Sequence, residues 1–176
     1  IYKRIVPLDH PDLAISLNNV GSMYDITADY PKALEHYLQA LDIKRASLPP
    51  GHSSLATAYN NIGAVYGKMD DHCKALEYYQ KALDVYDQSP QPNHSDLAVL
   101  FSNFGQLHHQ MENYSQALQF YERSLEAHRR ASISDETIEV ATVYNNIALL
   151  YTSMREHSKA LGFHLKSLEI KQKLLP

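Results

Sequence analysis

Apolar residues recur along this chain at spacings of three and four, which is typical of one face of an α-helix. Leu13, Leu17 and Val20 follow this spacing, and a second segment from Ala33 to Leu41 repeats it. Short polar stretches rich in helix-breaking residues separate the segments. The pattern therefore predicts an all-α chain, with helices at residues 12–27, 30–47, 54–69, 72–88, 96–111, 114–131, 137–154 and 157–174.

The chain also repeats itself. A shift of 42 residues places Gly21 on Gly63 and Gly63 on Gly105, and a further shift of 43 reaches Ala148. Each repeat holds two predicted helices, A and then B, so the chain reads as four helix–turn–helix hairpins. We expect one array over residues 1–176, opening at the end of a preceding B helix as though taken from a longer array. Residues 1–8 are the end of that preceding helix, and the four repeats occupy residues 12–50, 54–92, 96–133 and 137–175.

Two kinds of residue at fixed places in the repeat predict how each hairpin is built. A small residue stands at Gly21, Gly63, Gly105 or Ala148, which we call the small-residue position, and should let helix B approach helix A closely. A polar residue before each B helix should cap its free N–H groups. These expected caps are Asp29, Asp71 and Asn113, with Glu156 as a weaker one.

Composition and charge exclude several functions. The net charge is −4, so no basic field favours nucleic acid or an anionic membrane surface. No apolar run approaches the roughly 20 residues that span a bilayer, and the first residues show no signal peptide. The single cysteine, Cys73, fits a reducing compartment, so we expect a cytoplasmic protein.

Catalytic and metal-binding motifs are not visible either. No phosphate-binding glycine loop, zinc spacing or paired nucleophile and base occurs, so we expect no catalytic residue, no metal and no cofactor. His10, His52 and His94 recur with the repeat period just before each A helix, which indicates a role in starting helices.

The repeated residues resemble the tetratricopeptide repeat over nearly the whole chain. The family pattern places a large residue, a small residue and an aromatic residue in helix A, followed by Ala, an aromatic residue and Ala in helix B. The usual unit has about 34 residues. The longer unit here, with "HPDLA" before helix A and "LNN" within it, is similar to the repeats of kinesin light chains. The matching positions are Leu17/Tyr59/Phe101/Tyr144, Gly21/Gly63/Gly105/Ala148, Tyr24/Tyr66/His108/Tyr151, Ala33/Ala75/Ala117/Ala160, Tyr37/Tyr79/Tyr121/His164 and Ala40/Ala82/Ser124/Ser167.

One feature departs from that pattern. The family often has Gly in the turn between helices A and B, whereas this chain has Ala28, Asp70, Glu112 and Arg155. Either the turn is less tight, or one of these residues adopts a left-handed conformation at some cost.

The resemblance implies a right-handed superhelix, an α-solenoid, whose concave wall consists mostly of A helices. The flank of helix A that faces away from helix B would then face the groove, and it is small, polar and nearly uncharged. Amide side chains there could pair with the backbone of an extended peptide. We call the residues predicted to contact a ligand the A-helix stripe. They are Asn18, Ser22, Asp25, Thr57, Asn60, Ala64, Ser102, Gln106, His109, Thr142, Asn145 and Leu149.

A second asparagine follows in every repeat, about 100° further round the helix. This rotation points it toward the neighbouring repeat, so we expect a structural hydrogen bond between repeats rather than a ligand contact. The alternative is that both asparagines of each pair are structural. The second set consists of Asn19, Asn61, Asn103 and Asn146.

The leading hypothesis is a non-enzymatic module that binds a protein, as an extended peptide or a partner helix, as scaffold or cargo adaptor. Some proteins of this family clamp a terminal carboxylate with a Lys at the place of Asn60, and this chain has no cation there. Two alternatives stay open: a structural solenoid that associates end to end, and an accessory domain of a larger enzyme.

Overall fold

The computed structural model describes residues 11–131 and 137–174, and this part of the chain forms eight α-helices and no strand. The eight predicted helices are confirmed, with their ends displaced by two residues at most. The predicted helix end at residues 1–8 lies outside the described residues. The helices are α1 Pro11–Ile26, α2 Tyr30–Ser47, α3 Ser53–Lys68, α4 His72–Asp87, α5 His94–Gln110, α6 Tyr114–Arg130, α7 Ile138–Ser153 and α8 His157–Leu174.

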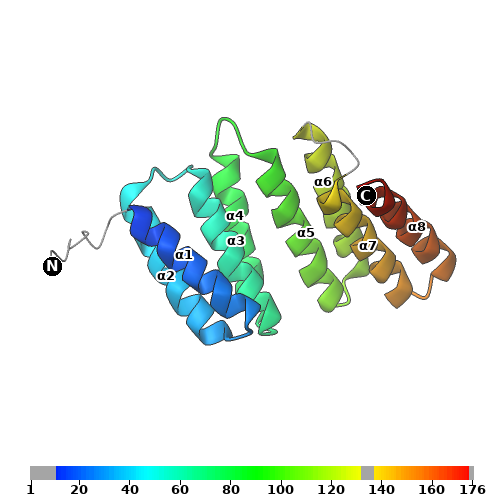
Figure 1. Ribbon diagram of the computed structural model, residues 1–176, viewed down its shortest axis with the longest axis horizontal. Helices are drawn as coiled ribbons and strands as arrows, with labels where there is room; N and C mark the ends of the chain where they lie inside the picture. Colours follow the sequence, from blue (N-terminus) through cyan, green and yellow to red (C-terminus); the bar gives the residue numbers. More distant parts are fainter. Residues whose placement is uncertain (1–10, 132–136, 175–176) are drawn as a thin grey trace. The chain divides into compact units, whose positions relative to one another are not determined.

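The helices fall into two compact units, one ending at Pro92 and the other beginning at Asn93. In the first unit α1 packs on α2, α2 on α3 and α3 on α4. In the second, α5 packs on α6, α6 on α7 and α7 on α8 (Figure 1). Within each unit, each helix therefore packs on the next one along the chain, which is the architecture of an all-α helical-repeat solenoid. The A helices are α1, α3, α5 and α7, and the B helices are α2, α4, α6 and α8.

The small-residue position brings the two helices of a hairpin together, as predicted. A Cβ on Gly63 would lie 2.6 Å from a ring carbon of the buried Tyr79, and a Cβ on Gly105 would lie 2.6 Å from Tyr121. The corresponding distance from Gly21 to Tyr37 is 2.8 Å. These contacts are shorter than packed carbon atoms allow, so the tyrosine ring occupies the volume that a methyl group would need.

The caps of the B helices follow the prediction in the first unit. Asp29 accepts a hydrogen bond from the backbone N–H of Lys32, and Asp71 accepts one from the N–H of Lys74. The prediction is wrong in one respect for Asn113. This residue stands at the N-cap of α6, but its side chain forms no capping hydrogen bond. Helix α6 therefore begins without the side-chain bond that stabilises α2 and α4.

All four turns between helices A and B contain a non-glycine residue in the left-handed conformation. The φ angles are 59° at Ala28 and Asp70 and 60° at Glu112 and Arg155. We expected one such residue at most, and instead every repeat keeps the tight turn. The backbone N–H of the next residue closes the turn, as in Asp29, which donates to the carbonyl oxygen of Tyr24 at 2.9 Å.

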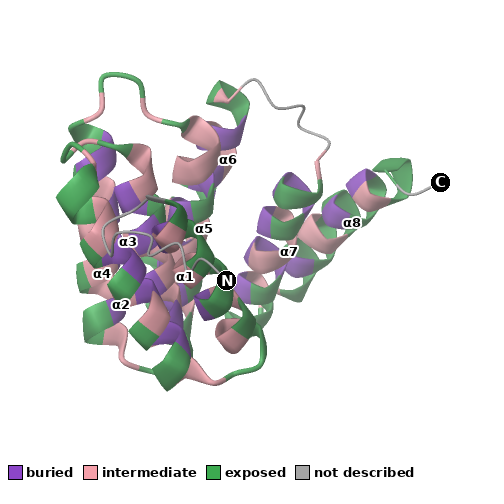
Figure 2. Ribbon diagram, turned by 60° about the vertical axis from the view of Figure 1, so that its left-hand side comes forward, coloured by how far each residue is buried: buried purple, intermediate pink, exposed green. Residues whose placement is uncertain are grey.

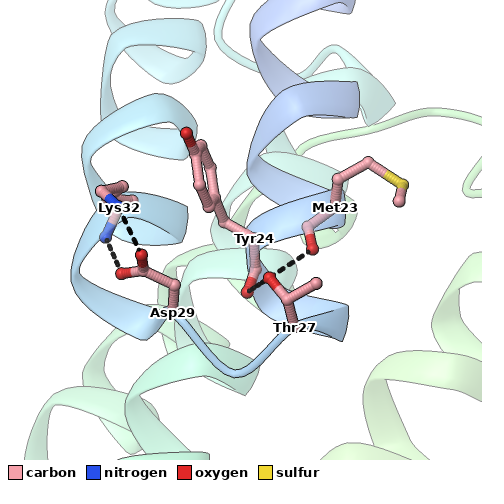
Figure 3. Close-up of polar contacts among 5 residues, drawn as sticks. All are labelled: Met23, Tyr24, Thr27, Asp29 and Lys32. Atoms are coloured by element: carbon pink, nitrogen blue, oxygen red, sulfur yellow. Dashed lines mark hydrogen bonds and ion pairs between the residues drawn. The ribbon is translucent and has the colours of Figure 1, made fainter.

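Figure 3 shows the first of these turns. The Thr27 hydroxyl donates to the carbonyl oxygens of Met23 and Tyr24, at 3.0 and 3.1 Å. Lys32 forms an ion pair with Asp29 at 2.7 Å, and its ammonium group lies 5.2 Å from the centre of the Tyr24 ring. The residue that caps helix B therefore also holds a cation over the last aromatic residue of helix A.

That aromatic residue packs on helix B in every hairpin. The ring of Tyr24 stacks on His36, and the ring of His108 stacks on Phe120, with centroids 5.5 and 5.2 Å apart. Tyr66 on Tyr78 and Tyr151 on Phe163 repeat the arrangement. The buried residues lie mainly where neighbouring helices meet (Figure 2). This packing fixes which flank of each A helix stays accessible.

Candidate functional site

The A-helix stripe lies on the accessible flank of the A helices. Its members come from α1 and α3 in the first unit and from α5 and α7 in the second. None of the twelve is buried: Thr57, Gln106, Thr142 and Leu149 are exposed and the other eight are half-buried. The residues between them along the helix, such as Ile62 and Val65 in α3, are fully buried. The helix period therefore separates the stripe from the core.

In the first unit, the two asparagine sets meet in one hydrogen bond. The side-chain N–H of Asn61 on α3 donates to Oδ1 of Asn18 on α1, at 3.2 Å. One asparagine that we assigned to ligand binding thus also holds the next repeat. The Asn18 amide keeps a lone pair and two N–H donors beyond this bond.

A second contact between repeats neutralises the only carboxylate of the stripe. Lys68 on α3 donates to both carboxylate oxygens of Asp25 on α1, each at 2.7 Å. The Asp25 side chain is 18% exposed and the Lys68 side chain 46% exposed. Because both charges are paired, this part of the stripe presents no net charge to a ligand.

A third contact of the same kind occurs in the second unit. Nε2 of His109 on α5 lies 2.9 Å from the hydroxyl of Ser153 on α7. Burial lowers the pKa of His109. The imidazole is therefore held in its neutral form at neutral pH, and the stripe in this unit also lacks a charge.

These three contacts obey one rule of sequence spacing. The bonded residues are separated by 43, 43 and 44 positions, which is one repeat plus one residue in each case. A stripe residue therefore bonds the residue one step further along the A helix of the next repeat. Lys68 and Ser153 were missed as members of the site because they do not lie on the stripe. An opposite charge one residue beyond the repeat period would have revealed Lys68 as the partner of Asp25.

Other polar side chains of the stripe are used within their own hairpin. The Thr57 and Thr142 hydroxyls donate to backbone carbonyls one turn earlier in the same helix, those of Ser53 and Ile138. Ser22 is hydrogen bonded to the buried Tyr37 of α2. The amides of Gln106 and Asn145, in contrast, form no side-chain hydrogen bond with the described residues. The amides of Gln106 and Asn145 are thus polar groups that the stripe offers to a ligand.

The second asparagine set occupies varied surroundings. Asn61 is half-buried and bonds to Asn18, whereas Asn19 is exposed and Asn146 is half-buried. Asn103 is half-buried on α5. That this second set forms structural hydrogen bonds between repeats stays a prediction for the set as a whole.

A cavity of about 440 Å³ lies apart from the stripe, in the first unit. It is an open crevice between the ends of α2 and α4, with the start of α3 as its floor. Two basic residues and one acidic residue lie among its lining, so its charge selects no ligand class. The lining residues are Arg45, Leu48, Pro50, Leu55, Tyr59, Lys81, Asp84, Val85 and Gln88.

The described residues give no sign of metal chemistry or of a membrane segment. No three His, Cys, Asp or Glu side chains in residues 11–131 and 137–174 are grouped closely enough to bind a metal ion. Within the same ranges, no helix combines the length and the apolarity that crossing a bilayer requires.

Comparison with known proteins adds a family and a fold. Two family models described as tetratricopeptide repeat match the chain, one over residues 54–130 and the other over residues 13–54 and 140–176. No curated protein matches the chain.

Two solved structures share the fold. The crystal structure of BtubC (BKLC) from P. vanneervenii superposes with a TM-score of 0.78 at 21% identity, over 94% of this chain and 66% of that chain. This chain therefore spans slightly less than two thirds of the length of BtubC. The crystal structure of MamA superposes with a TM-score of 0.61 at 20% identity, over 93% of this chain and 81% of that chain.

Proposed function

Because the chain belongs to the tetratricopeptide repeat family, we propose that it binds an extended peptide along its A-helix stripe. Such repeats serve in general as protein-interaction scaffolds. In this proposal the module is not catalytic, acts in the cytoplasm as a scaffold or cargo adaptor, and takes protein rather than nucleic acid or lipid as its partner. The net charge of −4 supports the choice of partner.

One observation carries the proposal: the stripe is accessible, uncharged and furnished with amides. Each residue of an extended peptide presents one N–H donor and one carbonyl acceptor. An Asn or Gln amide offers both kinds of partner. Asn18 and Asn145 are half-buried and Gln106 is exposed, so each can bond a peptide backbone without opening the hairpin.

The absence of a net charge on the stripe also bears on which kind of peptide we propose as the ligand. A site for an acidic motif or a terminal carboxylate needs a basic side chain at its centre. Here Lys68, which contacts the stripe at Asp25, already donates to both carboxylate oxygens of that residue. The ligand we propose is therefore recognised through its backbone and through small, uncharged side chains.

The test begins with a peptide selected against the 176-residue chain from a random library. Its affinity is then measured by calorimetry for the wild type and for the Gln106→Ala/Asn145→Ala double variant, whose two residues both lie in the second unit. Loss of two amide contacts, each worth about 0.5–1.5 kcal/mol, should weaken binding roughly 5- to 150-fold. The mass in solution should not change.

Gln116→Ala/Gln119→Ala is the matched control, because both glutamines are exposed on helix α6, away from the stripe. It removes two amides without touching an A helix and should leave the affinity unchanged. If the control variant loses affinity while the stripe variant keeps it, the ligand binds to the B helices and the proposal is wrong.

A further inference from the structure

The crevice in the first unit has an apolar floor and a polar rim. It lies between the ends of α2 and α4, where α3 begins, and α2 packs on α3 as α3 does on α4 (Figure 1). Its volume of about 440 Å³ falls within the roughly 300–1,000 Å³ of ligand sites. The floor consists of Leu55, Tyr59 and Val85, which are buried or half-buried, and the rim of Arg45, Lys81, Asp84 and Gln88.

The aromatic ring of the floor is open, although the corresponding ring of the next repeat is covered. In α5 that residue is Phe101, and the guanidinium of Arg123 lies 4.0 Å from the centre of its ring. Lys81 holds the place of Arg123 in α4, but its ammonium group lies over the ring of Tyr78, at 4.7 Å. Tyr59, at the place of Phe101, stays half-buried, so its ring can contact a ligand.

Charges of both signs meet at the rim. Arg45 lies on α2, whereas Lys81 and Asp84 lie on α4. Lys81 is already bound to Glu77, at 2.6 Å. An anion that pairs with Arg45 would also meet the carboxylate of Asp84, and a cation that pairs with Asp84 would meet the guanidinium. The rim therefore favours a ligand without charge.

The side chains that are free to bind such a ligand supply mostly hydrogen-bond donors. Within residues 11–131 and 137–174, those of Arg45, Gln88 and Tyr59 form no hydrogen bond or ion pair. A guanidinium has five N–H donors and no acceptor, and a Gln amide adds two donors. The carboxylate of Asp84 already accepts a hydrogen bond from Gln80, at 2.8 Å. The free groups therefore suit a ligand that carries carbonyl oxygens but few N–H groups.

We propose that the crevice binds a proline-rich segment of a partner protein in the polyproline II conformation. Proline has a backbone carbonyl and no N–H, so it brings an acceptor and no donor in need of a partner. The polyproline II helix has no internal hydrogen bonds and docks on aromatic surface. In the complex, proline rings contact Leu55, Tyr59 and Val85, while Arg45 and Gln88 donate to carbonyl oxygens.

The crevice shares no residue with the A-helix stripe. This proposal therefore does not rest on the binding of a peptide along the stripe, and either proposal can fail without the other.

Decaproline, acetylated and amidated at its ends, is the probe. It is titrated into the whole chain with labelled methyl groups, and nuclear magnetic resonance follows the signals of Leu48, Leu55 and Val85. These signals should shift and saturate. A Gly–Ser peptide of equal length should leave them in place, because it brings an N–H with every carbonyl. The signals of Val140 and Ile170, at the places of Leu55 and Val85 in the second unit, should not move.

The variant Arg45→Met/Gln88→Met removes the free donors and nearly keeps the length of both side chains. Both residues are exposed, so the variant should fold, which circular dichroism verifies. Loss of two hydrogen bonds should weaken decaproline binding roughly 5- to 150-fold. The matched control is Arg129→Met/Lys173→Met, at the same places of the second unit, where both cations are already ion-paired. It should leave the affinity unchanged.

Asp84→Asn tests whether the ligand is uncharged. This substitution removes a carboxylate from the rim and should leave the affinity for decaproline unchanged. A peptide of alternating Pro and Glu should bind the wild type more weakly than decaproline does, and should gain affinity in Asp84→Asn, because the repulsion between carboxylates is lost.

Four outcomes would overturn the proposal. Crevice methyl signals that decaproline leaves in place would show that the crevice does not bind this helix, and equal shifts with the Gly–Ser peptide would show that proline is not recognised. Tighter binding of the Pro–Glu peptide would assign the crevice to an acidic ligand. Equal losses in the crevice variant and its control would place the binding elsewhere. The Gln106→Ala/Asn145→Ala variant should bind decaproline like the wild type, so failure here is distinct from failure at the stripe.

Discussion

The tyrosines Tyr79 and Tyr121 lie against Gly63 and Gly105 more closely than a methyl group would permit. The fourth repeat differs at both positions, since Ala148 replaces the glycine and His164 replaces the tyrosine. A smaller ring accompanies the larger backbone residue, which keeps the summed volume at the crossing of the two helices nearly constant. The two residues at the helix crossing are therefore matched in size within each repeat, although their identities differ between repeats.

Replacing Gly105 by Ala should destabilise the second unit. The new Cβ would lie 2.6 Å from the Tyr121 ring, so the ring or the helix must shift, at a cost of about 1–3 kcal/mol. Chemical denaturation measures the change. Gly162→Ala is the control, because a Cβ there meets nothing within 4 Å and α8 should gain about 0.5–1 kcal/mol. Equal effects of the two substitutions would contradict this packing.

Whereas loss of a glycine should destabilise the second unit, gain of a glycine in one of its turns between helices A and B should stabilise it. Glu112 has a φ of 60°, a conformation that costs a non-glycine residue roughly 1–2 kcal/mol. Glu112→Gly removes this strain and loses part of the gain to the greater freedom of the unfolded chain, so we expect about 0.5–1 kcal/mol of added stability. Gln119→Gly, in the exposed interior of α6, should instead lose about 1 kcal/mol. A destabilising Glu112→Gly would show that the turn is not strained.

At the scale of the helices, side-chain hydrogen bonds join the two A helices of each unit. The bonded residues are separated along the chain by one repeat plus one residue. The sequence predicted the helices, their ends and the close crossing, because each depends on local spacing and on one small residue. It did not predict the partners of Asp25 and His109, since those depend on the rotation between stacked hairpins. Nor did it predict a left-handed residue in all four turns between helices A and B. This conformation favours glycine, but the geometry that the stacked helices impose outweighs that preference.

The ion pair between Asp25 and Lys68 should couple α1 to α3 measurably. A double-mutant cycle with Asp25→Asn and Lys68→Met isolates the interaction from the effects of each substitution alone. We expect a coupling energy of about 0.5–1 kcal/mol that shrinks at high salt, because both groups keep some contact with water. A coupling energy of zero would mean that this ion pair does not help to hold α3 against α1.

The buried histidines predict acid sensitivity of the second unit. Burial lowers the pKa of His108 and of His128 below the ordinary 6.5. Below that value the unfolded chain binds more protons than the folded one, so stability rises with pH through this window and is lost as pH falls. His108→Tyr, which installs the residue found at the matching place in the other three repeats, should reduce this loss.

Denaturation at roughly pH 7.5 and roughly pH 5.5, on either side of the ordinary histidine pKa, measures the effect. The difference in unfolding free energy between the two conditions should be smaller for His108→Tyr than for the wild type. Tyr66→Phe is the control, since it changes the matching aromatic residue in the first unit without adding or removing a histidine. An unchanged difference for His108→Tyr would mean that folding does not change the pKa of His108.

At the scale of the whole molecule, the repeat leaves the A-helix stripe accessible. The sequence predicted this stripe as a set of polar positions on the accessible flank. Sequence reasoning could place the stripe but could not tell which of its amides are already bonded, as Asn18 is to Asn61.

Nuclear magnetic resonance of the side-chain amides tests the central claim most directly. A library-selected peptide is titrated into the labelled chain while the Asn and Gln NH₂ signals are followed. The account predicts that the signals of Asn18, Gln106 and Asn145 shift with the dissociation constant found by calorimetry, while those of Gln116 and Gln119 stay in place. Shifts confined to the B helices, with the stripe signals unmoved, would contradict it.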